Sequence, residues 1–147
     1  MSNKLNKLKK VEEQKVPVKE TRKDALRRLF TENNLVEEDV YKDKRGFVII
    51  TRSGIDKIVS KQGITIAYEV VKLDKEMVVF KAVASMEGKN GKPRNMMSFG
   101  ESSDNNLMGG GKKFPVAMAE KRAMSRVVLK IAGFYEHGVF GQDEMAD

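Results

Sequence analysis

Hydrophobic and polar residues alternate with a period of two over most of residues 64–103, and the pattern changes to a helical period near Phe114. Alternation by twos places side chains on opposite faces of a strand, whereas a 3.6-residue period forms one apolar stripe along a helix. We therefore predict antiparallel strands in residues 64–74, 75–88 and 92–103. A helix from Pro115 to Gly133 is predicted to cover one face of this sheet, and the other segments attach to that unit.

The connections between these strands support hairpins. Asp74, Lys75 and Glu76 form a tripeptide of suitable length for the first turn. Residues 87–94 contain two glycines, an asparagine and a proline, which are strong turn formers. The second turn is predicted to present Lys89, Lys92 and Arg94 together at an exposed tip.

The last helix combines small, apolar and basic positions. Its alanines at positions 117, 119 and 123 are small enough to let the helix lie close to the sheet. Arg122 and Arg126 are one turn apart, so we expect them to form a compact cationic ridge on another side of the helix.

The region before the sheet predicts two shorter helices and one strand. Thr21 is a suitable N-cap for a helix over residues 22–32, whose basic residues form either a solvated face or a contact with a subunit or with DNA. Residues 47–50 form an apolar strand, and a helix follows that ends at Gly63. Thr51 and Ser53 are its candidate N-caps, and a phosphate near Arg52 is the alternative role for this helix start.

The pattern predicts an α+β fold class. The expected core is β-β-β-α, an antiparallel sheet of three to four strands packed by helices. We expect residues 1–19 to form a flexible, disordered basic tail, residues 20–135 to form one domain, and residues 136–147 to form a short acidic tail.

Composition excludes several function classes. The 147-residue chain has no cysteine and one histidine, so thiol catalysis, disulfides, thiolate metal sites and histidine clusters are excluded. The glycines before Lys112 lack the GxxxxGK[ST] spacing of a triphosphate loop, and the acidic residues form no paired motif. We therefore expect no catalytic residue, metal or cofactor. Without a long apolar run or a signal peptide, the protein is expected to be soluble and cytoplasmic.

Net charge points to a polyanionic partner. Twenty-eight Lys and Arg residues against twenty-one Asp and Glu residues give a formal charge of +7. Such an excess favours nucleic acid, and a solvated surface that happens to be positive is the alternative.

From Thr21 to Phe134 the order of elements resembles the Rad-fifty-two-like single-strand annealing superfamily, which includes phage annealing proteins of the Erf, RecT and Redβ types. Three stretches carry the resemblance: the strand and short helix of residues 46–63, the Ser-Phe-Gly-Glu sequence of residues 98–101, and the AEKRAMSRVVLKIAG helix of residues 119–133. The chain departs from that pattern because it has no tryptophan after the short helix and no separate C-terminal domain for recruiting partners.

The resemblance implies ATP-independent binding of single-stranded DNA and annealing of complementary strands in phage-type homologous recombination. It also implies self-assembly into a homo-oligomeric ring or filament, in the host cell cytoplasm if the chain is phage-encoded. The partners are then single-stranded DNA and further copies of the chain, and a recombinase or single-strand-binding partner is not identified. Two other functions stay open: a single-strand-binding protein that protects without annealing, and a metal-dependent nuclease.

Annealing requires cations on the phosphate backbone and free base edges. With the groove expected beside the sheet, the candidate lining residues are Arg52, Lys61, Lys72, Lys81, Lys92, Arg94, Lys112, Lys113, Arg122 and Arg126. Tyr68 and Phe99 are candidates for base stacking, whereas Phe80 is expected in the core.

Overall fold

The computed structural model describes residues 19–107 and 112–145, and these have the predicted α+β fold. In chain order the elements are α2 (Arg22–Glu32), the 3-10 helix η1 (Glu37–Asp39), β1 (Val40–Lys42), β2 (Val48–Ile50), α3 (Arg52–Gln62), β3 (Thr65–Leu73), β4 (Met77–Glu87), β5 (Pro93–Ser103), α4 (Pro115–Ile131), the 3-10 helix η3 (Tyr135–His137), β6 (Val139–Gly141) and the 3-10 helix η4 (Gln142–Glu144). Among these helices, none has the length and apolarity that crossing a membrane requires. The predicted tail of residues 1–19 falls almost entirely outside the described residues.

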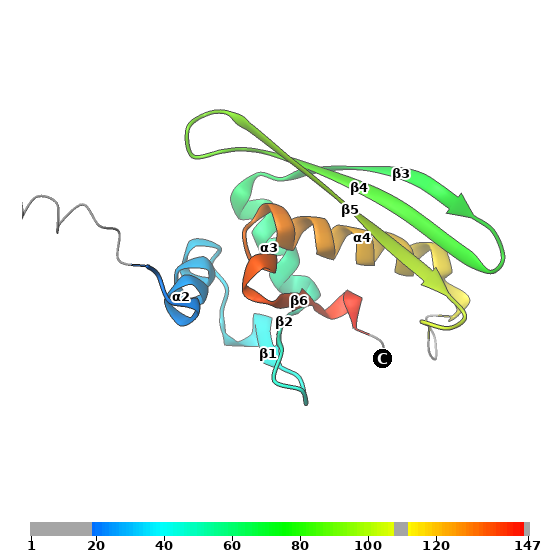
Figure 1. Ribbon diagram of the computed structural model, residues 1–147, viewed down its shortest axis with the longest axis horizontal. Helices are drawn as coiled ribbons and strands as arrows, with labels where there is room; N and C mark the ends of the chain where they lie inside the picture. The colour runs from blue at the N-terminus through cyan, green and yellow to red at the C-terminus, as the bar shows by residue number, and fades with distance from the viewer. Residues whose placement is uncertain (1–18, 108–111, 146–147) are drawn as a thin grey trace, which may run out of the picture.

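The larger sheet is antiparallel, in the order β3-β4-β5, as predicted. It extends over α4 as a long, twisted arm (Figure 1). Asp74 closes the first hairpin by accepting bonds from the backbone N–H groups of Glu76 and Met77. Gly91 in the second hairpin has a φ of 71°, a conformation that glycine adopts at little cost. The third strand is as long as the second, although its sequence pattern is weaker.

β5 and α4 approach each other closely at Gly100. Gly100 faces the helix where Ala119 and Ala123 are both fully buried. A Cβ atom added to Gly100 would overlap the backbone nitrogen of Ala123 and the backbone oxygen of Ala119. The alanines therefore allow the close approach that the sequence predicts, and a glycine on the strand is required as well.

Both shorter helices begin at the predicted residues. The Thr21 side chain accepts a bond from Asp24 N, and the Thr51 side chain accepts one from Gly54 N. Ser53 is not the cap of α3, because its hydroxyl donates to the buried carboxylate of Asp39. Gly63 ends α3 in the left-handed conformation, as predicted.

The prediction of an acidic tail over residues 136–147 is wrong for residues up to 145. β6 pairs in parallel with β2, in a second sheet of order β1-β2-β6, and Val139 is completely buried. The apolar run is only two residues long and its partner lies about ninety positions away, so no local pattern marks it. The same sheet includes β1, which directly follows the acidic run Glu37-Glu38-Asp39 and is not among the predicted strands.

We predict that Gly100→Ala destabilises the protein by about 2 kcal/mol or more, because the new methyl group forces β5 and α4 apart. Urea unfolding followed by circular dichroism measures this difference. Met97→Ala, on the exposed face of the same strand, is the control and is expected to change stability by less than about 1 kcal/mol. Equal stability of Gly100→Ala and the unmodified protein would contradict the packing described.

Candidate nucleic-acid interface

Arg122 is a structural residue. Only 4% of its surface is accessible to solvent. The guanidinium donates to Glu101 O at 2.9 Å, to Asn106 O at 2.7 Å and to Asp143 O at 3.2 Å. It therefore fastens β5, the loop after it and the C-terminal segment to α4. The expectation that Arg122 lies on an exposed cationic ridge is wrong, because these buried carbonyls hold it inside.

Arg126 is partly exposed, and two carboxylates offset its charge. It is 3.1 Å from Glu101 and 3.1 Å from Glu144, and it donates to Phe99 O at 2.9 Å. Burial by itself lowers the pKa of Arg126, but the bond to Glu101 and the charges of Glu101 and Glu144 outweigh burial and raise that pKa. The sequence does not reveal this arrangement, because Glu144 comes from the segment predicted to be a tail.

Glu144 contributes to the same network from a protected position. Its side chain is 4% exposed, and it accepts a bond from Gly141 N at 2.7 Å. Burial raises the pKa of Glu144 above its ordinary value, although the Gly141 N–H group and Arg126 both favour the charged carboxylate. The network therefore links α4 and β5 to the end of the chain.

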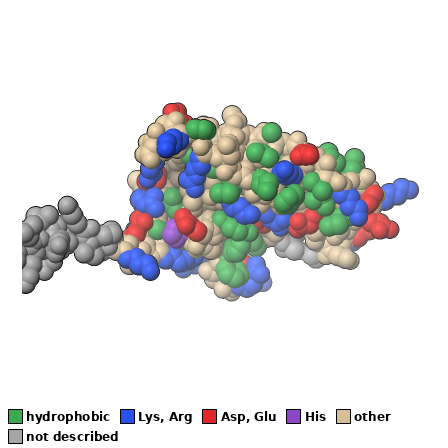
Figure 2. All heavy atoms as spheres, turned by 45° about the horizontal axis from the view of Figure 1, so that its top comes forward, with side chains coloured by type: hydrophobic (Ala, Val, Ile, Leu, Met, Phe, Trp, Pro, Cys, Tyr) green, Lys and Arg blue, Asp and Glu red, His purple; other side chains and the backbone are tan. Residues whose placement is uncertain are grey.

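The other eight predicted cations lie on several different elements. Lys72 and Lys81 lie on the large sheet, Lys112 and Lys113 precede α4, Arg52 and Lys61 lie on α3, and Lys92 and Arg94 lie at or beside the second hairpin. Three of them face acidic partners, with Lys72 3.5 Å from Asp74, Lys81 3.8 Å from Glu69, and Arg52 3.4 Å from both Asp56 and Asp143. On the face that Figure 2 presents, basic side chains are interspersed with hydrophobic and acidic ones.

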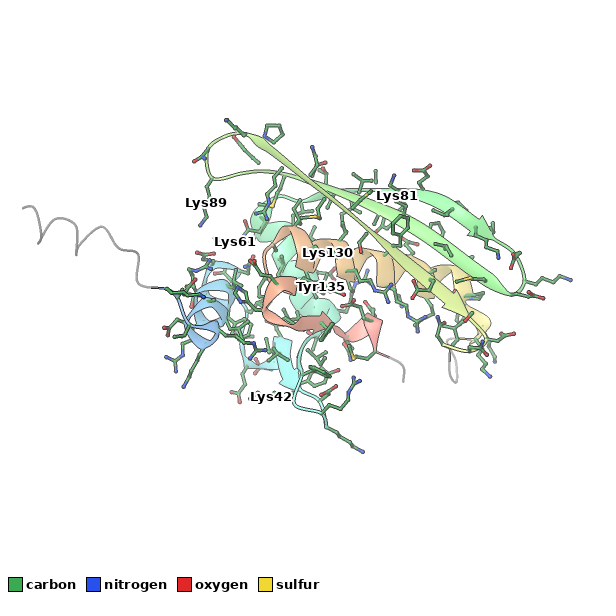
Figure 3. All side chains as sticks on the ribbon, viewed as in Figure 1. Lys42, Lys61, Lys81, Lys89, Lys130 and Tyr135 are labelled. Atoms are coloured by element: carbon green, nitrogen blue, oxygen red, sulfur yellow. The ribbon has the colours of Figure 1, made fainter. Side chains whose placement is uncertain are left out.

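A groove of about 450 Å³ runs beside the edge of β5, and we call it the β5 groove. Its lining residues come from β5, the C-terminal half of α4, η3, β6 and η4: Ser98, Phe99, Arg126, Lys130, Tyr135, Phe140, Glu144 and Met145. Lys130 and Tyr135 lie beneath the sheet in Figure 3, whereas Lys81 lies above it. A groove beside the sheet is what the resemblance implies, and Arg126 is the one predicted cation that lines it.

Three aromatic rings extend from this groove across the smaller sheet, and we call them the aromatic row. Tyr135 and Phe140 meet edge to face with centroids 5.8 Å apart, and Phe140 and Phe47 do so at 5.4 Å. Lys130 Nζ lies 5.4 Å from the Tyr135 ring centroid, and Arg45 Cζ lies 4.9 Å from that of Phe47. The row therefore has a cation–π contact at each end.

Sequence reasoning misses the aromatic row because three separate segments form it. Phe47 follows β1, Tyr135 begins η3, and Phe140 is in the middle of β6. The parallel pairing of β6 with β2 brings them together. The only signal in the sequence is the spacing of aromatic residues in FYEHGVF, which also fits ordinary core packing.

A second hollow, of about 290 Å³, lies between the β4–β5 hairpin, α2 and the C-terminal end of α4. Arg28, Lys89 and Arg94 line it together with Glu32, Glu87 and Glu136. Arg28 pairs with Glu20 and Glu32, whereas Lys89 and Arg94 form no ion pair with another described residue. This hollow and the β5 groove have no lining residue in common.

The three aromatic residues singled out in the sequence have different environments. Phe80 packs against the core, as expected. Phe99 lines the β5 groove and is 44% exposed. Tyr68 is 39% exposed on β3, and burial, followed by the nearby charge of Glu120, raises its pKa.

Comparison of the chain with protein-family models, with curated proteins and with solved structures gives no match. The resemblance described above therefore stays a prediction. Within residues 19–107 and 112–145, no three acidic or histidine side chains group in a way that could hold a metal ion.

We predict that Arg122→Leu lowers the free energy of unfolding by at least about 2 kcal/mol, because it leaves several backbone carbonyls without their donor. Thermal or urea unfolding measures the loss. Lys121→Leu, at the neighbouring exposed position, is the matched control and is expected to have little effect. If the two variants were equally stable, Arg122 would not have the fastening role that its contacts indicate.

Proposed function

We propose that this protein binds single-stranded DNA without a nucleotide cofactor and anneals complementary strands. The observation that carries this proposal is the aromatic row of Tyr135, Phe140 and Phe47, with Lys130 at one end and Arg45 at the other. Aromatic rings combined with cations are the usual means of holding single strands independently of sequence.

The chemistry of the row suits annealing. Rings offer stacking surfaces to any base, and the cations attract phosphates, so a bound strand keeps its hydrogen-bonding edges available to a complement. Lys130 forms no ion pair with another described residue, whereas Arg45 also pairs with Asp43 at 2.9 Å. Phe47 is 41% exposed, so part of the row is open to solvent.

The resemblance to the single-strand annealing superfamily supports the same function. It depends on the order of elements and on residues 46–63, 98–101 and 119–133, which include Phe47 of the aromatic row and Lys130 at one end of it. The α+β architecture agrees with that order.

A single-strand-binding protein that protects DNA without annealing it is the second candidate. The same rings and cations would favour it, because stacking and phosphate contacts do not by themselves accelerate pairing. The two functions differ in the rate at which complementary strands pair, which a protective protein slows for structured strands.

We propose a homo-oligomer, with β3 at the contact. In the described residues β3 pairs only with β4, and Val70, Val71 and Leu73 on it are each more than half exposed. On the opposite edge of the sheet, two carbonyls of β5 are already occupied, because Arg126 bonds Phe99 O and Arg122 bonds Glu101 O. An open apolar edge is a site for pairing with another chain.

We predict that light scattering gives a mass of several chains and that Val71→Lys on β3 shifts the distribution toward the monomer, because a charge disfavours edge pairing. Lys75→Ala, in the adjacent turn, is the control. A clean monomer at micromolar concentrations would contradict the assembly and weaken the family resemblance.

For DNA binding, we predict a change in the slope of the logarithm of oligothymidylate affinity against the logarithm of salt concentration. Each lost phosphate contact reduces the steepness of this slope by about 0.7, so the double variant Lys130→Gln with Arg45→Gln is expected to reduce it by roughly 1.4. Tyr135→Leu with Phe140→Leu is expected to weaken binding by about 1 to 3 kcal/mol per lost stack, with the salt dependence unchanged. Fluorescence anisotropy across a salt series measures both.

Lys112→Gln with Lys113→Gln removes two exposed cations on the N-terminal side of α4 and is the matched control. It is expected to leave the salt dependence unchanged. If this pair alone flattened the dependence, the strand would bind elsewhere and the aromatic row would not be the interface.

A further inference from the structure

We propose that the cleft between α2 and the β1–β2 hairpin binds an acidic peptide segment of another protein, which inserts an aromatic or large aliphatic side chain. We call this surface the α2 cleft. It uses neither the aromatic row nor the β5 groove, so the inference does not depend on the proposed function.

The α2 cleft has a volume of about 650 Å³. The residues that line it are of two kinds: apolar or aromatic (Leu26, Phe30, Val40, Tyr41 and Val48) and basic (Arg22, Lys23, Arg27 and Lys42). Tyr41 is 41% exposed, and Phe30 packs partly into the core. In Figure 3, Lys42 lies at the smaller sheet, away from the β4–β5 hairpin with Lys89.

The charges of the α2 cleft all have one sign. No carboxylate lines it, and within the described parts of the chain Lys23, Arg27 and Lys42 form no ion pair. Arg22 donates to the backbone oxygen of His137 at 2.8 Å and keeps its charge. Arg28, on the same helix, is instead neutralised by Glu20 and Glu32. Four cations around an apolar floor complement a partner that carries several carboxylates.

The apolar lining of the α2 cleft favours burial of a peptide side chain over burial of a nucleobase. Leu26, Val40 and Val48 are aliphatic, so they offer no hydrogen bond to the polar edge of a base. Burying that edge without partners costs free energy, whereas a Phe or Leu side chain loses nothing by burial.

Two further observations agree with a peptide partner. β1 pairs only with β2 in the described part of the chain, so its other edge can bond an extended backbone. The chain's own residues 1–18 carry five lysines and two glutamates, so they have the same sign as the cations of the cleft and do not complement them.

The test uses a fluorescein-labelled peptide in which a Phe-Leu pair stands between two runs of aspartate. We expect it to bind the full chain, with an affinity that falls about tenfold or more in Arg27→Gln with Lys42→Gln. Lys112→Gln with Lys113→Gln, which removes the same charge elsewhere, is expected to bind the peptide as the unmodified protein does. Circular dichroism of each variant verifies its fold.

Three outcomes would overturn the proposal. The first is no binding of the Phe-Leu peptide. The second is equal binding of a peptide with Ser-Ser in place of Phe-Leu, which would indicate general attraction of polyanions. The third combines two observations: the variant Arg27→Gln with Lys42→Gln no longer binds oligothymidylate, and oligothymidylate displaces the peptide from the unmodified protein. Together they would show that the α2 cleft binds nucleic acid. The variant Lys130→Gln with Arg45→Gln is expected to bind the peptide as the unmodified protein does. A failure of the DNA-binding proposal can therefore be told apart from a failure of the peptide proposal.

Discussion

The close approach of α4 to β5 at Gly100 is the constraint on which the contacts around the helix depend. With no Cβ on the strand and only methyl groups on Ala119 and Ala123, helix and strand approach more closely than larger residues allow. Residues on the next turns of α4 then lie beside the edge of the strand. Arg122 and Arg126 reach the carbonyl oxygens of Glu101 and Phe99 from there.

That geometry gives the two arginines a structural role. A buried guanidinium is stable only where acceptors surround it, and Arg122 has carbonyl acceptors from β5, from the following loop and from Asp143. Arg126 joins Glu101 to Glu144. Together they occupy two carbonyls on one edge of the sheet and hold η4 against α4. They also bring β6 beside β2, where Phe140 completes the aromatic row.

Much of the fold is predictable from the sequence because its signals are local. Period-two alternation indicates β3 and β4, the glycine and asparagine of the second turn indicate a hairpin, and Thr21, Thr51 and Gly63 mark helix ends. β1 and β6 are not predictable, because each has three residues and is stable only through distant pairing. The site is harder to predict for the same reason. Whether a basic residue is exposed depends on which carboxylates and carbonyls the fold brings near it, and Glu144 reaches Arg126 only after β6 is in place.

The proposed function assigns its main role to two cations that the sequence does not emphasise. Lys130 and Arg45 are far apart in the chain but lie at the two ends of one aromatic row. Residues in such a row can hold a strand by its bases and phosphates without reading its sequence. An account of this kind requires no metal, nucleotide or catalytic side chain.

The most direct test is the rate at which two complementary labelled oligonucleotides pair, followed by fluorescence with and without the protein. The account predicts faster pairing with the unmodified chain, and pairing near the protein-free rate with Tyr135→Leu and Phe140→Leu combined. Pairing no faster with the unmodified protein than without it would contradict annealing, even if single-stranded DNA still bound.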